Sequence, residues 1–382
     1  MSTAPSATLP ASAAATARWV TSGSARKGNV ERPEPAERTL DLLVVGAGPT
    51  AIAIGAEARR AGLSALLVDR GPLCAAIVGF PDDMLFFTTR DRLEIAGVPF
   101  AIPEDKPNRR QALAYYQGVV RRHRLDLALY EEVDRVRRGA DGTFAVDTHA
   151  TDGSGRRRRR RARAVALATG YFDNPNRLGA EGEDLPWVRC RYRRPWDHFG
   201  QHVVVVGGGN SAAETALDLW RHGARVTIVH RRSRLKPSIK YWLLPDVENR
   251  IAEGSIDARF DAVVTAFREA GDGRQRGLEL RRHDGATSFL PADVAYVLIG
   301  YQPDDGFLRR CGIEVDDATL VPAFDAATCE TNVPGLYVAG TLQAGRRTNV
   351  IFIENARDHG ARIVGHLRRR QRREAGQRGR RG

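Results

Sequence analysis

Two glycine-rich segments carry residues that could bind phosphate groups. Gly46 and Gly48 follow the apolar run LLVV, and Gly207 and Gly209 follow the apolar run VVVV. Each loop leads into an apolar helical pattern, so its backbone lies at a helix N-terminus, where free N–H groups and the helix dipole favour an anion. This order of strand, glycine loop and helix predicts binding of a dinucleotide diphosphate.

The two segments are copies of one unit. An offset of 161 residues places Gly46 on Gly207 and Asp69 on His230. One glycine-rich turn is a weak signal, whereas its repetition at a fixed offset is a strong one. The repeat predicts two mononucleotide-binding folds and therefore two bound dinucleotides.

The residues that end the second strand of each copy distinguish the two ligands. The first copy ends in Asp69, whose carboxylate suits a free ribose diol and repels an added phosphate. The second copy ends in His230, Arg231 and Arg232, with Lys236 further on. Guanidinium groups bind phosphate through paired hydrogen bonds, so this copy is predicted to prefer the 2′-phosphate of NADP.

The elements around these loops follow from periodicity and from turn residues. Residues 70–100 contain many turn signals and are expected to form an irregular cover over a ligand. A helix is predicted from Asn108 to Arg122, and strands are predicted near 127–130, 144–147 and 165–167. The chain is expected to return to the first unit at DVAYVLIGYQPD and again at PGLYVAG, and a final helix is expected from about Asn349 to Leu367.

The predicted fold is α/β, with two Rossmann-like dinucleotide-binding domains, the second inserted in the first. The expected divisions are a disordered N-terminal extension (1–37), the first part of the first domain (38–185), the second domain (186–298), the second part of the first domain (299–367) and a basic disordered tail (368–382). The extension is rich in alanine, serine, threonine and proline.

The charge of the 382-residue chain is unevenly distributed. Its net charge is +13, yet seven arginines in residues 156–163, together with eight arginines and one glutamate in residues 368–382, account for +14. The rest is near −1, and neither basic run has the interleaved aromatic residues that stack on bases, so no specific nucleic-acid partner is predicted. The first run is expected to lie at or beside a solvated turn.

No stretch is apolar enough to predict a membrane span, and a cytoplasmic location is expected. Four widely separated cysteines form no CxxC motif, which argues against a disulfide scaffold and against a metal site, and reduced thiols are expected.

The order of the motifs GAGP, ATG, GGGNSAAE, HRR, GYQPD and PGLYVAG resembles that of the low-molecular-weight thioredoxin reductases. Within that group, FFTT, LEIAGVPF, ATGYFDNP, PSIK and FIEN make residues 40–367 most similar to the bacillithiol disulfide reductase family. The resemblance implies FAD in the first domain, NADPH in the second, and hydride transfer from NADPH to FAD. It also implies a small disulfide or another electron acceptor as partner, and a homodimer.

The resemblance also implies which residues contact the cofactors, although it identifies no catalytic residue. On the FAD side it implies Gly46, Gly48, Pro49, Thr50, Asp69, Thr169, Gly170, Gly340, Glu354 and Asn355. On the NADPH side it implies Gly207, Gly209, Asn210, Ser211, His230, Arg231 and Arg232.

Three positions depart from the family patterns. Arg193 stands where a CxxC motif at Cys190 would have its second thiol, and Thr50 stands where the bacillithiol disulfide reductases have a cysteine after GAGP. A hydroxyl group cannot form the mixed disulfide of thiol exchange. Thr341 replaces an acidic residue that bonds the ribityl chain of FAD.

Three other functions share parts of these motifs. A flavin-containing monooxygenase needs no dithiol, but the segment between the two loops lacks the FxGxxxHxxx(F/Y) pattern of that group. A ferredoxin- or flavodoxin-NADP reductase has the same fold without active cysteines. A sensor that binds both cofactors without turnover belongs to a different class, and it would show negligible steady-state NADPH oxidation.

Overall fold

The computed structural model describes residues 39–269 and 276–378, which belong to one compact unit. The predicted disordered extension, residues 1–37, lies outside the described residues. Within the described residues, no helix combines the length and the apolar character needed to cross a bilayer.

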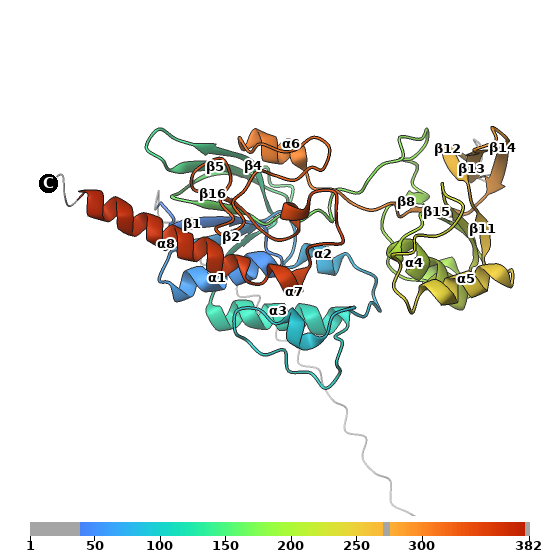
Figure 1. Cartoon of the computed structure of the whole chain (residues 1–382), viewed down its shortest axis with the longest axis horizontal. Helices are drawn as coiled ribbons and strands as arrows, with labels where there is room; N and C mark the ends of the chain where they lie inside the picture. Colours follow the sequence, from blue (N-terminus) through green and yellow to red (C-terminus); the bar gives the residue numbers. More distant parts are fainter. Residues whose placement is uncertain (1–38, 270–275, 379–382) are drawn as a thin grey trace, which may run out of the picture. The chain divides into compact units, whose positions relative to one another are not determined.

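Two five-stranded parallel sheets form the framework (Figure 1). The first sheet contains, in spatial order, β16 (Leu336–Val338), β7 (Val165–Leu167), β1 (Leu42–Val45), β2 (Ala65–Asp69) and β3 (Asp126–Leu129). The second contains β11 (Asp257–Arg259), β10 (Arg225–Val229), β9 (His202–Val206), β15 (Val294–Val297) and β8 (Val188–Arg189). The second sheet lies between β7 and β16 in sequence, which confirms two Rossmann-like domains with the second inserted in the first. The strand of DVAYVLIGYQPD is β15, a member of the second sheet, so the chain returns to the first sheet only after it.

Two three-stranded antiparallel sheets accompany the parallel ones. One contains β4 (Glu131–Arg138), β5 (Phe144–Ala150) and β6 (Arg157–Ala162), and the other contains β12 (Ala262–Glu269), β13 (Arg276–Arg282) and β14 (Thr287–Pro291). The helices are α1 (Pro49–Arg60), α2 (Ala75–Val78), α3 (Arg109–His123), α4 (Asn210–Arg221), α5 (Leu244–Ala252), α6 (Asp305–Arg310), α7 (Ile353–Ala356) and α8 (His359–Arg378), with short 3-10 helices η1 (Arg90–Leu93), η2 (Trp196–His198) and η3 (Gly340–Ala344).

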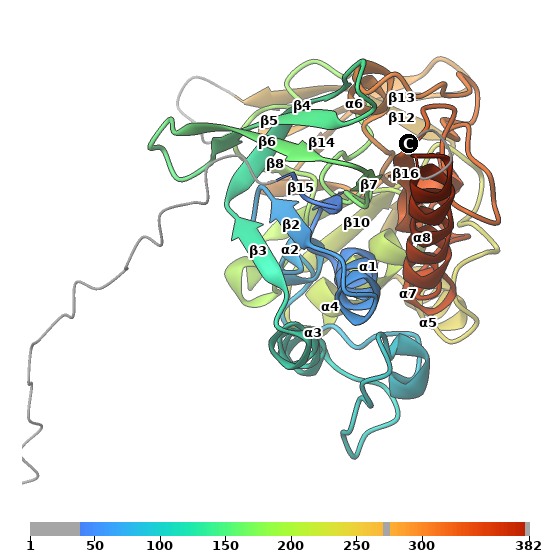
Figure 2. The same ribbon diagram turned by 90° about the vertical axis from the view of Figure 1, so that its left-hand side faces the viewer.

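Strand β1 shows why the first sheet needs cover on both faces. Leu42 and Val44 belong to a core formed with α1, α3 and α8, whereas Leu43 and Val45 belong to a core formed with the β4–β6 sheet. Figure 2 shows the β4–β6 sheet on one side of β1 and β2 and helices α1 and α3 on the other. Side chains alternate across a strand, and a central parallel strand is buried on both faces. The unbroken apolar run LLVV is therefore what this position requires.

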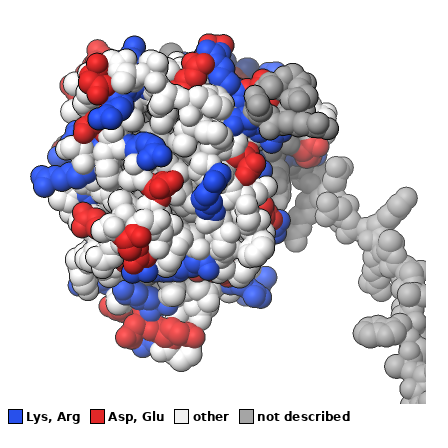
Figure 3. Space-filling model, turned by 90° about the vertical axis from the view of Figure 1, so that its right-hand side faces the viewer, with Lys and Arg blue, Asp and Glu red and all other residues white. Residues whose placement is uncertain are grey.

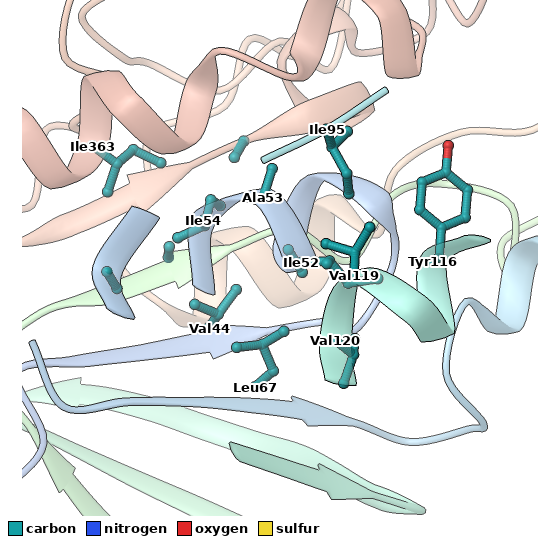
Figure 4. Packing of buried hydrophobic residues seen from close by; sticks show 14 of the residues in the cluster. Val44, Ile52, Ala53, Ile54, Leu67, Ile95, Tyr116, Val119, Val120 and Ile363 are labelled. Atoms are coloured by element: carbon teal, nitrogen blue, oxygen red, sulfur yellow. The ribbon is translucent and has the colours of Figure 1, made fainter. Parts of the chain in front are cut away.

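Helix α1 is the centre of the first core (Figure 4). Ile52 and Ile54 are fully buried, and burial of each such side chain contributes about 1.5 to 3 kcal/mol. Glycines bring neighbouring elements close to α1: a Cβ atom at Gly55 would lie 2.8 Å from Leu67 of β2, and one at Gly360 would lie 2.9 Å from the Ala53 carbonyl oxygen. Helix α1 is thereby held against β2 and α8.

Helix α3 confirms the helix predicted from Asn108. The Asn108 side chain accepts a hydrogen bond from the Gln111 amide, and the Gln111 side chain accepts one from the Asn108 amide. This reciprocal cap satisfies two backbone donors at the helix start. Tyr116 and Val120 on this helix are buried.

The arginine run at residues 156–163 lies beside the bends at residues 151–154, as predicted, but most of the run itself forms a strand, which was not predicted. Residues 157–162 form β6, whose side chains alternate between the two faces of the sheet. Arg160 makes a bidentate ion pair with the buried Glu131 at 2.9 Å. Although burial opposes the shift, hydrogen bonds from Arg160 and Thr148 lower the pKa of Glu131. Carboxylates from the neighbouring strands β4 and β5 therefore balance the positive charges of the arginine run.

The prediction for the C-terminal region is wrong in two respects. In place of one helix from Asn349 to Leu367, a short α7 precedes α8. Helix α8 continues to Arg378, through most of the predicted disordered tail. Arg370 pairs with Glu374 one turn later at 3.1 Å and with Glu330 at 3.2 Å, and arginine is a good helix former. Residues 379–382 lie outside the described residues.

Basic and acidic side chains are mixed over the face of the molecule in Figure 3. Blue and red groups alternate there without one continuous basic area. That face therefore lacks the basic stripe that marks a nucleic-acid footprint.

Candidate functional site

In the first glycine loop, Gly46 is packed tightly against neighbouring backbone, whereas Gly48 faces open space. Gly46 has φ +116°, and a Cβ atom there would lie 2.5 Å from the Ala168 carbonyl oxygen at the end of β7. Gly48 is the N-cap of α1, where no side chain caps the helix and a Cβ atom would meet no atom within 4 Å. The α1 N-terminus thus presents uncapped amides to open space, as a diphosphate requires.

Asp69 fixes the shape of this loop from the end of β2. Its two carboxylate oxygens accept hydrogen bonds from the Ala47 amide at 2.7 Å and the Gly71 amide at 2.8 Å. Burial raises the pKa of Asp69, and these amide hydrogen bonds oppose the shift. Each carboxylate oxygen has a second lone pair, so the group can still accept from a ribose hydroxyl.

Four predicted FAD-side residues meet where β7 and β16 end. A Cβ atom at Gly340 would lie 2.9 Å from the Thr50 hydroxyl, and one at Gly170 would lie 3.5 Å from the Thr341 hydroxyl. Thr169 stands beside Gly170 at the end of β7. Buried His359, at the start of α8, accepts a hydrogen bond from the Gly340 amide through Nδ1 at 3.0 Å. Sequence reasoning missed His359, because no motif relates it to Gly340.

Glu354 and Asn355 of α7, which were predicted to contact FAD, have different partners. Glu354 accepts a hydrogen bond from the Thr88 hydroxyl of the cover. Asn355 uses its side chain within its own turn, where it accepts from the Phe352 amide at 2.7 Å and donates to the Val350 carbonyl at 2.8 Å. Asn355 therefore shapes the α7 start, and the contacts of its side chain are to the chain itself.

The second glycine loop repeats the geometry of the first. A Cβ atom at Gly207 would lie 2.5 Å from the Leu298 carbonyl oxygen after β15, whereas one at Gly209 would meet open space. Helix α4 has no side-chain cap at Gly209. The Asn210 side chain accepts a hydrogen bond from the Lys240 amide at 2.9 Å.

His230 lies against this second loop. A Cβ atom at Gly208 would collide with its imidazole ring, and the ring is 6% exposed. Among the described residues its Nε2 atom has no hydrogen-bond partner. Burial lowers the pKa of His230, and Lys236, Arg231 and Arg232 add to the shift. A buried ring nitrogen without a partner, beside exposed Arg231 and Arg232, fits a ligand that brings its own polar groups.

A cavity of about 1840 Å³ joins the second loop to the cover of the first domain. This volume exceeds the range of about 300 to 1,000 Å³ that is typical of one small-molecule site. The predicted residues in its lining are Gly207, Gly209, Asn210, Ser211, His230, Arg231 and Glu354. Its lining does not include Gly46, Gly48, Pro49, Thr50, Asp69, Thr169, Gly170, Arg232, Gly340 or Asn355.

Glu214 is the cavity residue best suited to exchange a proton near neutral pH. It lies on α4, one turn after Asn210. Burial raises the pKa of Glu214 to about 7, Asp218 adds to the shift and Lys240 opposes it. No motif in the sequence points to Glu214, because its raised pKa depends on how α4 is buried.

The cysteines offer little thiolate. All four are free, and only Cys190 is exposed. Burial raises the pKa of Cys74, Cys311 and Cys329, which disfavours their reactive form. Buried Cys74, whose pKa is raised, is therefore a poor candidate for a reactive thiol.

Comparison with known proteins places this geometry in a family. The model of the pyridine nucleotide-disulphide oxidoreductase family matches residues 43–340, which span both glycine loops. The chain belongs to this family. The protein is accordingly an NADPH-dependent flavoprotein oxidoreductase, with FAD and NADPH as its cofactors.

Three relatives of this oxidoreductase are similar over nearly their whole length. Bacilliredoxin reductase Bdr of Bacillus subtilis is 34% identical over 329 residues, which are 86% of this chain and 98% of the relative. The structure of bacillithiol disulfide reductase Bdr (YpdA) from Bacillus cereus has a TM-score of 0.83 and 34% identity, and the match covers 87% of this chain and 100% of that one. The protein of the same name from Staphylococcus aureus has a TM-score of 0.79 and 34% identity, over 86% and 98% of the two chains.

The two loops fit the two cofactors of the family. FAD, when bound, accepts two electrons from NADPH and passes them to an acceptor. The uncapped amides at Gly48 would hold one diphosphate and those at Gly209 the other. Asp69 would orient a ribose, and His230 and Arg231 would bind the 2′-phosphate of NADPH.

Arg231→Ala tests the proposed 2′-phosphate contact. We expect kcat/KM for NADPH to fall by about 10- to 100-fold, the scale of one charged hydrogen-bonded contact, while kcat/KM for NADH changes by less than about twofold. Steady-state kinetics with both nucleotides measure this ratio. Arg282→Ala, which replaces an exposed arginine of β13, is the matched control. Equal losses with NADPH and NADH would refute the assignment.

Proposed function

We propose that this oxidoreductase reduces low-molecular-weight disulfides. The overall reaction is NADPH + H⁺ + RSSR → NADP⁺ + 2 RSH, in which the S–S bond breaks and both sulfurs gain one electron and one proton. The cavity that the second glycine loop shares with the FAD-side cover carries the proposal, because it has room for an acceptor beside a nucleotide. The relatives named bacillithiol disulfide reductase support it.

The proposed reaction needs no thiol in the first glycine loop. Thr50 lies against Gly340 and has no sulfur to offer. Of the four cysteines, three are buried, and Cys190 is the one exposed thiol. We therefore propose that electrons pass to the disulfide directly from the flavin, with residues of the chain orienting the disulfide.

A cysteine replacement series tests this function. The purified protein is expected to show a flavin spectrum and to form two thiols per NADPH oxidised with a small disulfide such as bacillithiol disulfide. Cys190→Ser is expected to retain kcat within about twofold, as is Cys74→Ala, the buried control. The assay follows NADPH absorbance and thiol titration under anaerobic conditions.

Two results would contradict this proposal in different ways. Flavin reduction by NADPH without thiol formation would show that the acceptor is of another class, such as ferredoxin or oxygen. A loss of more than about 100-fold in Cys190→Ser, with an unchanged flavin spectrum, would show that thiol exchange occurs at Cys190 and would refute direct transfer.

A further inference from the structure

Two lysines in the cavity wall have no carboxylate partner. Lys106 comes from the loop before α3, and Lys240 comes from the segment between β10 and α5. Within the ranges that the structure describes, neither lysine forms an ion pair. Lys240 lies near enough to Glu214 to oppose the rise in the pKa of that carboxyl group, but the two side chains make no ion pair.

The two lysines are joined by a chain of aromatic contacts. The Lys106 Nζ atom lies 4.9 Å from the centre of the Trp242 ring, and the Lys240 Nζ atom lies 5.3 Å from that of Phe87. The two rings meet edge to face, with their centres 5.7 Å apart. Trp242 remains 40% exposed, so these rings are not simply core residues. We call Lys106, Lys240, Phe87 and Trp242 the lysine clamp.

Other cations in the same wall have different partners, and Arg346, which forms no ion pair within the described residues, donates a hydrogen bond to the Gln302 side chain at 3.1 Å. Four arginines pair with carboxylates, namely Arg177 with Asp184, Arg191 with Asp173, Arg193 with Asp82 and Arg221 with Asp246. Arg231 and Lys236 act electrostatically on His230, at the proposed 2′-phosphate position. Lys106 lies in the loop between the FAD-side cover and α3, so a nucleotide at the α4 N-terminus does not explain its charge.

The chemistry of the lysine clamp defines a ligand. Two ammonium groups without an ion-pair partner attract carboxylates, and the half-buried Phe87 and the 40% exposed Trp242 offer aromatic surface for an apolar group beside them. Backbone anchoring of Lys240 by Asn210 at 2.9 Å holds one cation beside the second glycine loop. The clamp is thus part of the wall where the acceptor must approach.

We infer that the lysine clamp binds the carboxylate groups of the acceptor, so that the preferred substrates are anionic low-molecular-weight disulfides. This inference rests on the proposed disulfide reductase function and adds a specificity site to it. Lys106 and Lys240 neutralise the carboxylates, while Phe87 and Trp242 contact the body of the disulfide.

Two aromatic disulfides, one negatively charged and one neutral, distinguish the effect of charge from that of shape. The dianion 5,5′-dithiobis(2-nitrobenzoate) and neutral 4,4′-dithiodipyridine are both aromatic disulfides. Holoenzyme is reduced with one equivalent of NADPH, and its reoxidation by each probe is followed by stopped-flow flavin absorbance. We expect Lys106→Gln/Lys240→Gln to slow reoxidation by the dianion by about tenfold, the scale of two exposed charge pairs, and to leave the neutral probe within about twofold.

The controls distinguish failure of the clamp from failure of the proposed function. Arg282→Gln removes one positive charge from the exposed end of β13, away from the cavity lining, and it is expected to leave reoxidation by both probes unchanged. Equal effects of the double substitution on the two probes would overturn the clamp alone. A raised KM for NADPH in Lys240→Gln with unchanged reoxidation would assign Lys240 to the nucleotide. If neither probe reoxidised the wild-type flavin, the proposed disulfide reductase function would be refuted, and the proposed role of the lysine clamp would be refuted as well.

Discussion

Gly46→Ala is expected to abolish FAD binding and to lower the free energy of unfolding by about 3 to 5 kcal/mol. At φ +116° a non-glycine residue is strained, and the added methyl group would lie 2.5 Å from the Ala168 carbonyl oxygen. That oxygen belongs to backbone at the end of β7, so it cannot move aside as a flexible side chain could. The clash would separate the first loop from the sheet that holds it. Flavin absorbance after gel filtration and urea unfolding of the apoprotein measure the two effects.

Gly48→Ala is the matched control for this prediction. A Cβ atom at Gly48 meets nothing within 4 Å, so apoprotein stability is expected to change by less than about 1 kcal/mol. The methyl group would still stand where the FAD diphosphate is proposed to approach, and a loss of FAD affinity of at least about tenfold is expected. If Gly48→Ala bound FAD normally, the diphosphate could not lie at this loop. Full stability in Gly46→Ala would contradict the close contact with β7.

Features that depend on local sequence could be predicted. Each glycine loop lies within one strand, turn and helix, so apolar runs and glycine positions were sufficient to locate both. The cap at Asn108 is equally local, since its partner Gln111 is three residues away. The repetition of the unit then indicated the fold class, because two such units need two parallel sheets.

Features that depend on distant segments could not be predicted. The arginine run is a strand because Glu131 and Asp147, from the two strands that precede it, accept its guanidinium groups. A run of identical charges shows no alternation in the sequence, although the side chains of this strand alternate between the two faces of the sheet. Lys106 and Trp242 are likewise distant in the chain, and nothing near either residue indicates their contact.

His359 is the clearest case of a residue that gains its role from the fold. It is 4% exposed, and burial lowers its pKa to about 4, with Arg362 adding to the shift. Because Nδ1 accepts the Gly340 N–H, the neutral ring must carry its proton on Nε2. Protonation of Nδ1 would set two N–H groups against each other beside the turn that contacts Thr50.

This arrangement predicts a loss of stability in acid. An unfolded histidine titrates near 6.5, so between about pH 6.5 and pH 4 the unfolded chain binds a proton that the folded chain does not. Stability from this group is fully present above pH 6.5 and falls as the pH drops through that window, by about 3 kcal/mol in total. Other carboxylates and histidines also change the free energy of unfolding with pH, so a variant is needed to isolate the contribution of His359.

His359→Gln supplies that variant. Its amide oxygen can still accept the Gly340 N–H, but it does not titrate, so the decline between pH 6.5 and pH 4 is expected to be smaller by about 3 kcal/mol. Urea unfolding of the apoprotein at several pH values measures the slope without a contribution from bound FAD. Arg372→Gln, an exposed change on the same helix, leaves His359 in place and should keep the wild-type slope. An unchanged slope in His359→Gln would show that His359 is protonated in the folded state, and the Gly340 turn would then need another acceptor.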